Sequence, residues 1–250
     1  MGTSFDTAQG KLSIVATPIG NLEDITLRAL RTFKECDVIY AEDTRIIAKL
    51  LARYEIKKPL QRLDAATEIK KANEIIARLE AGEHVVYVSD AGTPGISDPG
   101  SRLVSLIRAR RPSVASSEGG NGGIVKIEVI PGPSALTAAL SIAGIDSSAF
   151  TFIGFLPHKK GRQTALKKIT AMVRKDSPQG GMPVVLYESP HRILKLLKEL
   201  SLHDRARVTL ARELTKIHEE VISGTPQEVL AHFVKHADTV KGEFVVIVTP

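Results

Sequence analysis

Cysteine, tryptophan and long apolar runs are scarce or missing in this sequence of 250 residues. The single Cys36 permits no internal disulfide and provides no cysteine cluster for zinc. No apolar run approaches the roughly 18 to 20 residues that span a bilayer. The N-terminal MGTSFDTAQG lacks both the basic and the apolar region of a signal peptide. We therefore expect a cytoplasmic protein without a membrane-spanning segment.

The usual signatures of nucleotide and metal enzymes are also missing. There is no GxxxxGK[ST], and the first apolar run continues into ATPIGN instead of GxGxxG, so neither a P-loop nor the common dinucleotide fingerprint is present. No HExxH occurs and the seven histidines are scattered, so we expect no metal site. Aromatic residues make up only 4% of the chain, which argues against extensive base stacking of the kind that single-strand binders use.

The composition that remains is that of a globular protein with a small excess of positive charge. Hydrophobic residues are 43% and charged residues 25%, enough for a real core. Lysine and arginine number 34 against 28 acidic residues, a net charge of +6. This excess is compatible with a polyanionic partner, although many proteins without one are equally basic.

Short apolar runs alternate with amphipathic helical stretches along almost the whole chain. One helical stretch has the apolar stripe Ile193, Leu196, Leu197 and Leu200. The runs are rich in β-branched residues and apolar on both faces, as strands of a sheet covered by helices are. They predict an α/β fold with mainly parallel sheets, and their residue ranges are 12–19, 37–42, 84–90, 124–132, 150–157, 183–189, 207–215 and 243–249.

Two segments predict a division of the chain. RPSVASSEGGNGG (111–123) is rich in serine and glycine and predicts a flexible surface loop. IPGPSA (130–135) contains a Pro-Gly-Pro turn before an alanine-rich helical stretch, and we place the domain junction there. The predicted organisation is a flexible tail at 1–10, an N-terminal α/β domain at 11–131 and a C-terminal α/β domain at 132–250.

SDAGTPGISDPG (89–100) is the most informative segment. It follows a predicted strand and precedes a predicted helix, where parallel sheets place their ligand loops. Its glycines allow close approach of the backbone to a ligand, and Asp98 followed by proline is a typical helix start. The alternative is that Asp90 and Asp98 only cap turns and helices.

Charged clusters predict a possible polyanion site in the second half of the chain. YESPHR (187–192) and RELTKIHEE (212–220) combine acidic and basic groups that can hold a polyanion and transfer a proton. The segment 159–175 contains seven lysines and arginines and no acidic residue. For each cluster, a solvated charged surface is the alternative explanation.

Taken together, these blocks resemble the ribosomal RNA small-subunit 2′-O-ribose methyltransferases of the tetrapyrrole-methylase-like superfamily. The resemblance covers nearly the whole chain, but family members often have a histidine- and asparagine-containing block where this chain has LDAATE (63–68). The matching segments, in family order, are VATPIGNLEDITLRAL (15–30), AEDTR (41–45), SDAGTPGISDPG (89–100), PGPSA (131–135), GFLP (154–157), YESPHR (187–192), RELTKIHEE (212–220) and KGEF (241–244).

The resemblance implies a tetrapyrrole-methylase-like fold of two α/β domains, with S-adenosylmethionine in the cleft between them. It also implies a homodimer that methylates the 2′-hydroxyl of a cytidine ribose in the decoding region of small-subunit (16S) ribosomal RNA. By motif position, the cofactor-binding residues are Ile19, Asp90, Ala91, Gly92, Thr93, Ile96, Ser134, Ala135, Tyr187 and Glu188.

We further expect the second domain to hold RNA and to transfer the proton. In this hypothesis Arg192, Arg212, Lys167 and Lys168 bind RNA. The candidate catalytic residues are Glu213, Glu219 and Lys216, with one of the two carboxylates accepting or orienting the hydroxyl proton.

Two other functions are compatible with parts of the pattern. A small-molecule methyltransferase of the tetrapyrrole type would share the fold and the cofactor but would not need the lysine-rich segment. A non-catalytic RNA-binding assembly protein would need the basic surface but not the cofactor loop. Binding of S-adenosylmethionine separates the second alternative from the other two functions.

Overall fold

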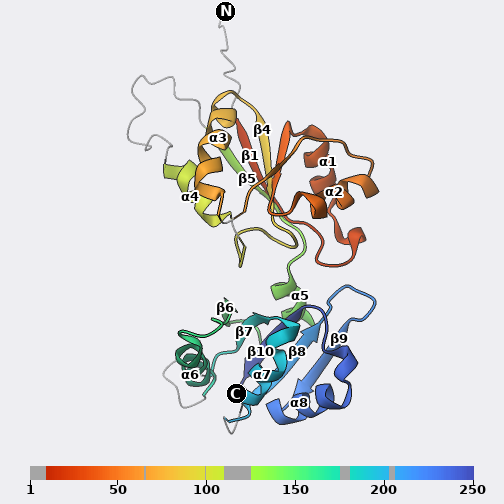
Figure 1. Cartoon of the computed structure of the whole chain (residues 1–250), viewed down its shortest axis with the longest axis vertical. Helices are drawn as coiled ribbons and strands as arrows, with labels where there is room; N and C mark the ends of the chain where they lie inside the picture. Colours follow the sequence, from red (N-terminus) through yellow and green to blue (C-terminus); the bar gives the residue numbers. More distant parts are fainter. Residues whose placement is uncertain (1–9, 65, 99, 110–124, 175–180, 203–205) are drawn as a thin grey trace, which may run out of the picture. The chain divides into compact units, whose positions relative to one another are not determined.

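The computed structural model describes residues 10–64, 66–98, 100–109, 125–174, 181–202 and 206–250. The chain divides into two compact units, Met1–Ser134 and Ala135–Pro250, each with one five-stranded sheet (Figure 1). The expected loop at 111–123 and all but the last residue of the expected tail at 1–10 lie outside the described residues. No described helix is long and apolar enough to cross a membrane.

The sheet of the first unit is entirely parallel. Its strands lie in the order β3-β2-β4-β1-β5, so that β1 and β4 occupy its centre. This parallel sheet is the one that the doubly apolar runs predicted. The strands are β1 (Lys11–Val15), β2 (Val38–Ala41), β3 (Leu60–Arg62), β4 (His84–Val88) and β5 (Lys126–Ile130).

Helices cover both faces of this sheet, as Figure 1 shows. Helices α1 (Leu27–Glu35) and α2 (Thr44–Arg53), preceded by the short η1 (Leu22–Asp24), pack on the face to which Ile39 and Ala41 belong. Helices α3 (Glu68–Glu80) and α4 (Ser101–Ala109) pack on the face to which Val38 and Tyr40 belong. Both faces of β2 are therefore buried, which explains its uninterrupted apolar sequence.

The start of α4 differs from the prediction. The helix begins at Ser101, three residues after Asp98. The buried Glu68 of α3 instead accepts hydrogen bonds from the backbone N–H groups of Gly100 (3.0 Å) and Leu103 (2.8 Å). A carboxylate of another helix thus satisfies donors that the first turn of α4 cannot satisfy internally.

The sheet of the second unit is mixed, with the order β6-β7-β10-β8-β9. Only β6 and β7 pair in parallel, and the other three pairs are antiparallel. The α/β class is confirmed, but the expected mainly parallel sheet applies to the first unit alone. These strands are β6 (Thr151–Phe155), β7 (Val184–Glu188), β8 (Arg207–Arg212), β9 (Glu220–Gly224) and β10 (Phe244–Thr249).

One apolar core holds the second unit together. Helices α6 (Arg162–Val173), α7 (Pro190–Leu200) and α8 (Pro226–Lys235) pack on alternate residues of β7, β8 and β10. Helix α5 (Ala135–Ile142) contacts β10, and the short η3 (Ala237–Thr239) follows α8. The predicted stripe of α7 is confirmed, because Ile193, Leu196, Leu197 and Leu200 are all buried in this core.

Candidate functional site

The candidate site of the first unit lies where three neighbouring parallel strands end. Strand β1 has β4 on one side and β5 on the other, so the loops that follow all three leave the same edge of the sheet. Ligands of open α/β sheets bind outside the carboxyl ends of the strands. This edge brings together the segments after Val15, Val88 and Ile130 that were predicted to bind a cofactor.

Gly92 joins two of these loops through its backbone. Its N–H donates to Thr17 O and its carbonyl accepts from Thr17 N–H, both at 3.0 Å. Its φ of +72° belongs to the left-handed region that favours glycine, and a Cβ there would lie 3.3 Å from Ile19 Cγ2. Thr93 Oγ1 donates to Pro133 O at 3.1 Å and ties in the third loop. The positions of Ile19, Gly92 and Thr93 are therefore set by one another.

The groups at this edge fit a cofactor with a polar and an apolar part, as S-adenosylmethionine has. Thr17 Oγ1 is buried and has no hydrogen-bond partner within the described residues. Ile96 is exposed, and Ala91 is partly buried in the same loop. Ser134 ends the first unit, and Ala135 is the first residue of α5 in the second. The unpartnered hydroxyl, the close backbone of Gly92 and the exposed Ile96 would hold such a cofactor.

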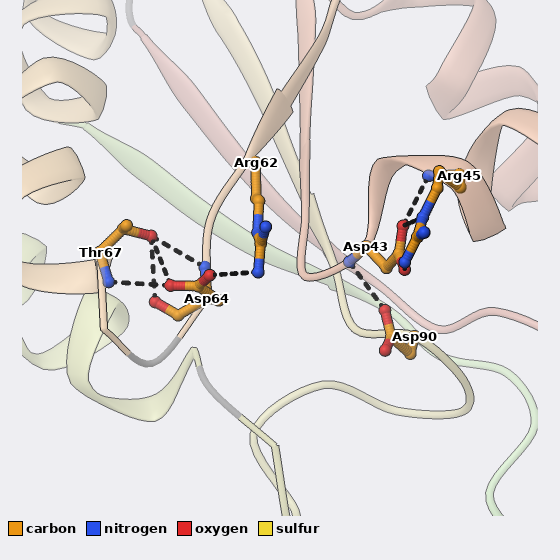
Figure 2. A network of polar contacts seen from close by, with 6 residues as sticks. All are labelled: Asp43, Arg45, Arg62, Asp64, Thr67 and Asp90. Carbon is orange, nitrogen blue, oxygen red and sulfur yellow. Dashed lines mark hydrogen bonds and ion pairs between the residues drawn. The ribbon is translucent and has the colours of Figure 1, made fainter.

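Asp90 connects the loop after β4 to the segment that follows strand β2. Its Oδ1 accepts from the backbone N–H of Asp43 at 2.8 Å (Figure 2). Asp43 is the N-cap of α2 and pairs with Arg45, and the hydrogen bonds from Arg45 lower the pKa of Asp43 to about 2. The sequence alone did not indicate a role for Asp43, although AEDTR lies at the end of the predicted strand 37–42 and could have indicated one.

A second polar group at the same edge follows the short strand β3. Asp64 pairs with Arg62 at 2.8 Å and accepts from the backbone N–H of Thr67 at 2.9 Å (Figure 2). This group comes from LDAATE, where the family's histidine- and asparagine-containing block would stand. Strand β3 has three residues and no buried one, so its sequence gave no apolar signal that could have revealed it.

Two carboxyl groups near Asp90 differ from these ion-paired ones. Burial raises the pKa of Glu42, and the charges of Asp90, Asp98 and Asp64 raise it further. Burial, followed by the charge of Asp90, also raises the pKa of Asp98. The ligand edge of the first sheet is therefore acidic. Within the described ranges, no three histidine, cysteine, aspartate or glutamate side chains could share a metal ion.

In the second unit, Glu188 is part of a buried ion cluster at the end of β7. It lies 2.6 Å from Arg192 Nη2 and 3.4 Å from Arg162 Nη1, and it accepts from the backbone N–H of Ser189. Arg162 also pairs with Glu199 of α7 at 2.7 Å. Of the expected RNA-binding residues, Arg192 is thus directed inward, where its Nη1 also donates to Leu156 O at 2.8 Å. The cluster joins α6, β7 and α7.

Tyr187 lies on the opposite face of β7 from Glu188 and packs against aromatic rings. Its ring meets those of Phe152 and Phe155 edge-on, with centroids 5.1 and 5.6 Å apart. Phe155 is half-exposed. Of the two predicted cofactor residues on β7, Tyr187 has the more accessible surroundings, because the oxygens of Glu188 have internal partners.

The segment RELTKIHEE forms the turn between β8 and β9, and its charges mostly satisfy one another. Arg212 is buried and pairs with Glu220 at 3.1 Å. Lys216 pairs with Glu213 at 2.8 Å, and Glu213 also accepts from Glu243 N–H. Glu219 accepts from Thr215 N–H at 2.6 Å and is exposed.

The pKa of Glu213 lies below its usual value. Burial alone would raise it, but the hydrogen bonds from Lys216 and from the N–H of Glu243 outweigh that effect. Glu213 is therefore a weak proton acceptor. The expected catalytic residues Glu213, Lys216 and Glu219 all lie within the turn between β8 and β9.

Helix α6 has one apolar and one basic face. Leu166, Ile169 and Val173 are buried, whereas Lys167 and Lys168 are exposed. Arg162 does not belong to the basic face, because it is buried in the ion cluster with Glu188. Lys175 lies outside the described residues.

Comparison with known proteins gives one family and several close relatives. The profile of the Tetrapyrrole (Corrin/Porphyrin) Methylases matches residues 11–230. A protein of Thermotoga maritima named "Ribosomal RNA small subunit methyltransferase I" is 43% identical over 227 residues, which are 90% of this chain and 93% of that protein.

Solved structures show the same fold at lower identity. The methyltransferase CobJ superposes with a TM-score of 0.67 at 19% identity, covering 96% of this chain and 94% of that one. Uroporphyrin-III C-methyltransferase from Thermus thermophilus, complexed with S-adenyl homocysteine, superposes with a TM-score of 0.58 at 20% identity, covering 96% and 97%.

Proposed function

The chain belongs to the tetrapyrrole methylase family, and from this we propose that it transfers a methyl group from S-adenosylmethionine to small-subunit ribosomal RNA. The 43% identity to a small-subunit ribosomal RNA methyltransferase over 90% of the chain carries the proposal. The finer form of the proposal is methylation of a cytidine ribose at its 2′-hydroxyl in the decoding region. It rests on the order of the sequence motifs from ATPIGN to KGEF.

The cofactor is proposed to bind at the carboxyl edge of the first sheet. The observation that supports this is the pairing of Gly92 with Thr17, which holds a buried, unpartnered hydroxyl beside a glycine backbone. Ile19, Asp90, Ala91, Thr93, Ile96 and Ser134 belong to the same three loops. The proposed set also includes Ala135, Tyr187 and Glu188 of the second unit. Glu188 is proposed to act indirectly, by holding the residues around it in position.

When bound, S-adenosylmethionine supplies an electrophilic methyl group on a sulfonium. The protein then has to align the acceptor hydroxyl with that methyl group and to remove the hydroxyl proton. Alignment of reactants is worth roughly 7–11 kcal/mol of the barrier, and a positioned base adds about 10² to 10⁴-fold. Most of the acceleration is thus expected from positioning.

RNA is proposed to contact the exposed basic face of α6. Lys167 and Lys168 extend from that helix into solvent, and the helix has no acidic residue. Arg192 and Arg212 are both held in internal ion pairs. They are therefore proposed to support RNA binding indirectly, by stabilising the ends of β7 and β8. We also propose a homodimer, which sedimentation at micromolar concentration would test.

Transfer of labelled methyl groups tests the proposal directly. Purified protein and labelled S-adenosylmethionine are incubated with small ribosomal subunits, with free small-subunit RNA or with a tetrapyrrole. We expect the label to appear in RNA. Nuclease mapping followed by nucleoside analysis is then expected to identify a 2′-O-methylcytidine. Label in the tetrapyrrole alone would favour a small-molecule enzyme, and absence of cofactor binding by calorimetry would favour a non-catalytic RNA-binding protein.

A further inference from the structure

Glu42 is a carboxylate without a partner at the ligand edge of the first sheet. It follows β2 directly and is partly buried. Within the described residues it has no hydrogen bond and no ion pair, whereas its neighbours Asp43 and Asp64 pair with Arg45 and Arg62. Asp90, the next carboxylate along the edge, is held by the N–H of Asp43. Asp43, Asp64 and Asp90 thus have cationic or N–H partners, and Glu42 does not.

The hydroxyl of Tyr87 provides a second, independent observation at the same place. Tyr87 is fully buried, and its hydroxyl has no hydrogen-bond partner among the residues that the structure describes. Tyr87 pairs with Tyr40 in the sheet, and Glu42 follows two residues after Tyr40, directly beyond the end of β2. Burial raises the pKa of Tyr87 most, and among the charges that raise it further that of Glu42 is the largest, followed by those of Glu68, Asp98 and Asp90. Buried hydroxyls normally have a partner, so a polar group of a ligand or of water is expected here.

The close packing of the loop on Tyr87 keeps this arrangement in place. Gly100 has a φ of +120°, and a Cβ at this position would lie 2.4 Å from Tyr87 Cε1. Any larger residue would displace the ring and with it the hydroxyl. The N–H of Gly100 is in turn held by Glu68 at 3.0 Å. The position of the Tyr87 ring therefore depends on the start of α4.

We propose that Glu42 is the general base that accepts the proton of the acceptor hydroxyl during methyl transfer. A lone pair of the hydroxyl oxygen forms the new C–O bond, and the electron pair of the O–H bond stays on that oxygen as the proton passes to the Glu42 carboxylate. The C–S bond breaks with its electron pair remaining on sulfur, so charge is balanced. This inference rests on the proposed function, and it assigns the base to the first unit instead of to Glu213 or Glu219.

The surroundings of Glu42 make it a better base than those candidates. Its pKa is raised by burial and by the negative charges of Asp90, Asp98 and Asp64, whereas that of Glu213 is lowered. The nearby cations Arg45 and Arg62 are paired with other carboxylates. A carboxylate with a raised pKa is a stronger base and accepts a proton more readily.

Single-turnover kinetics on the full chain test the assignment. Glu42→Gln should slow methyl transfer to small subunits about 10²-fold or more and leave the affinity for S-adenosylmethionine unchanged. Its melting temperature should equal or exceed that of the parent protein, because folding disfavours the ionised carboxylate. Glu80→Gln, an exposed carboxylate of α3, is the matched control and should react at the parent rate.

The pH dependence of the same rate gives a readout that a structural role would not change. The parent rate should fall as the pH falls through the pKa of Glu42, because the protonated carboxyl cannot accept a proton. Asp98→Asn removes a charge that raises this pKa, so the acid limb should move to lower pH. An acid limb that stays in place, or a Glu42→Gln variant that reacts at the parent rate, would overturn the assignment. A parent protein that methylates no RNA would instead overturn the proposed function.

Discussion

Single residues at the carboxyl edge of the first sheet differ in how completely the fold satisfies them. Asp43, Asp64 and Asp90 accept hydrogen bonds from within the protein. Among the described residues, the buried hydroxyl of Tyr87 has no partner, and the partly buried Glu42 has neither a hydrogen bond nor an ion pair. Folding normally pairs buried polar groups. Groups that stay unpaired next to a ligand loop are therefore the ones to test for function.

Gly92 is the residue on which the proposed cofactor site depends most. Gly92→Val places a branched side chain at a φ of +72° and against Ile19. We expect the affinity for S-adenosylmethionine, measured by calorimetry, to fall at least about tenfold, or about 1.4 kcal/mol.

Gly144 offers a matched control for this substitution. Its φ of +65° imposes the same backbone strain, but a Cβ there would meet nothing within 4 Å. Gly144→Val should therefore lower the melting temperature and leave cofactor binding intact. If both variants bind the cofactor like the parent protein, the loop is not part of the site.

At the scale of whole elements, the ion cluster of Arg162 determines how α6, β7 and α7 fit together. Arg162 is only 3% exposed, and its guanidinium lies between the carboxylates of Glu188 and Glu199. Arg162→Met should lower the free energy of unfolding by about 3–5 kcal/mol, since it leaves buried carboxylates without one of their cations.

Urea denaturation measures this cost. Lys168→Met on the same helix removes an exposed cation and should change the free energy of unfolding by less than about 0.5 kcal/mol. Equal stability of the two variants would mean that Arg192 alone is sufficient to compensate Glu188.

The outer face of α6 is expected to contact phosphates. Reversing Lys167 and Lys168 to glutamate should weaken RNA binding and make it less dependent on salt. Each lost phosphate contact lowers the slope of log K against log salt by about 0.7 to 0.9. The same reversal of Lys195 and Lys198, exposed on α7, serves as the control. Identical slopes for both double variants would show that the α6 lysines form only a solvated surface.

For the molecule as a whole, folding creates a pH-dependent stability through His84. Its Nε2 lies 2.8 Å from the buried hydroxyl of Ser13, on the strand next to it. Burial lowers the pKa of His84 below its ordinary value of 6.5, and Lys11 lowers it further, while Glu128, Asp37 and Glu35 act in the opposite direction. Between the two pKa values the unfolded chain binds more protons than the folded one, so stability decreases as the pH falls below 6.5.

His84→Gln tests this effect, because glutamine keeps an N–H donor for Ser13 but does not titrate. Urea denaturation at about pH 7.5 and about pH 5.5 compares the free energies of unfolding. The parent protein should lose more stability between the two values than the variant does. An equal loss in both proteins would assign the effect to other groups.

Most strands and helices follow from the sequence because local patterns report burial. The β-branched runs at 84–90 and 183–189 became β4 and β7, and the stripe from Ile193 to Leu200 became the buried face of α7. The glycine-rich loop after β4 was predicted to lie at a ligand edge because a strand before it and a helix after it leave little choice. Strands β3 and β9 were not predicted, because each lies at a sheet edge and has an incomplete apolar pattern.

Strand direction and side-chain partners required the folded chain. A run of residues that is apolar on both faces indicates a buried strand, but it does not indicate whether the neighbouring strand is parallel. The antiparallel pairing of β10 with β7 and β8 could therefore not be predicted from the sequence. Arg162 and Glu188 are 26 positions apart, and only the packing of α6 on β7 makes them partners. Glu42 and Tyr87 lie at the same end of the sheet because β2 pairs in parallel with β4 across 47 positions. Such contacts depend on which segments the core brings together, and residue type alone does not specify them.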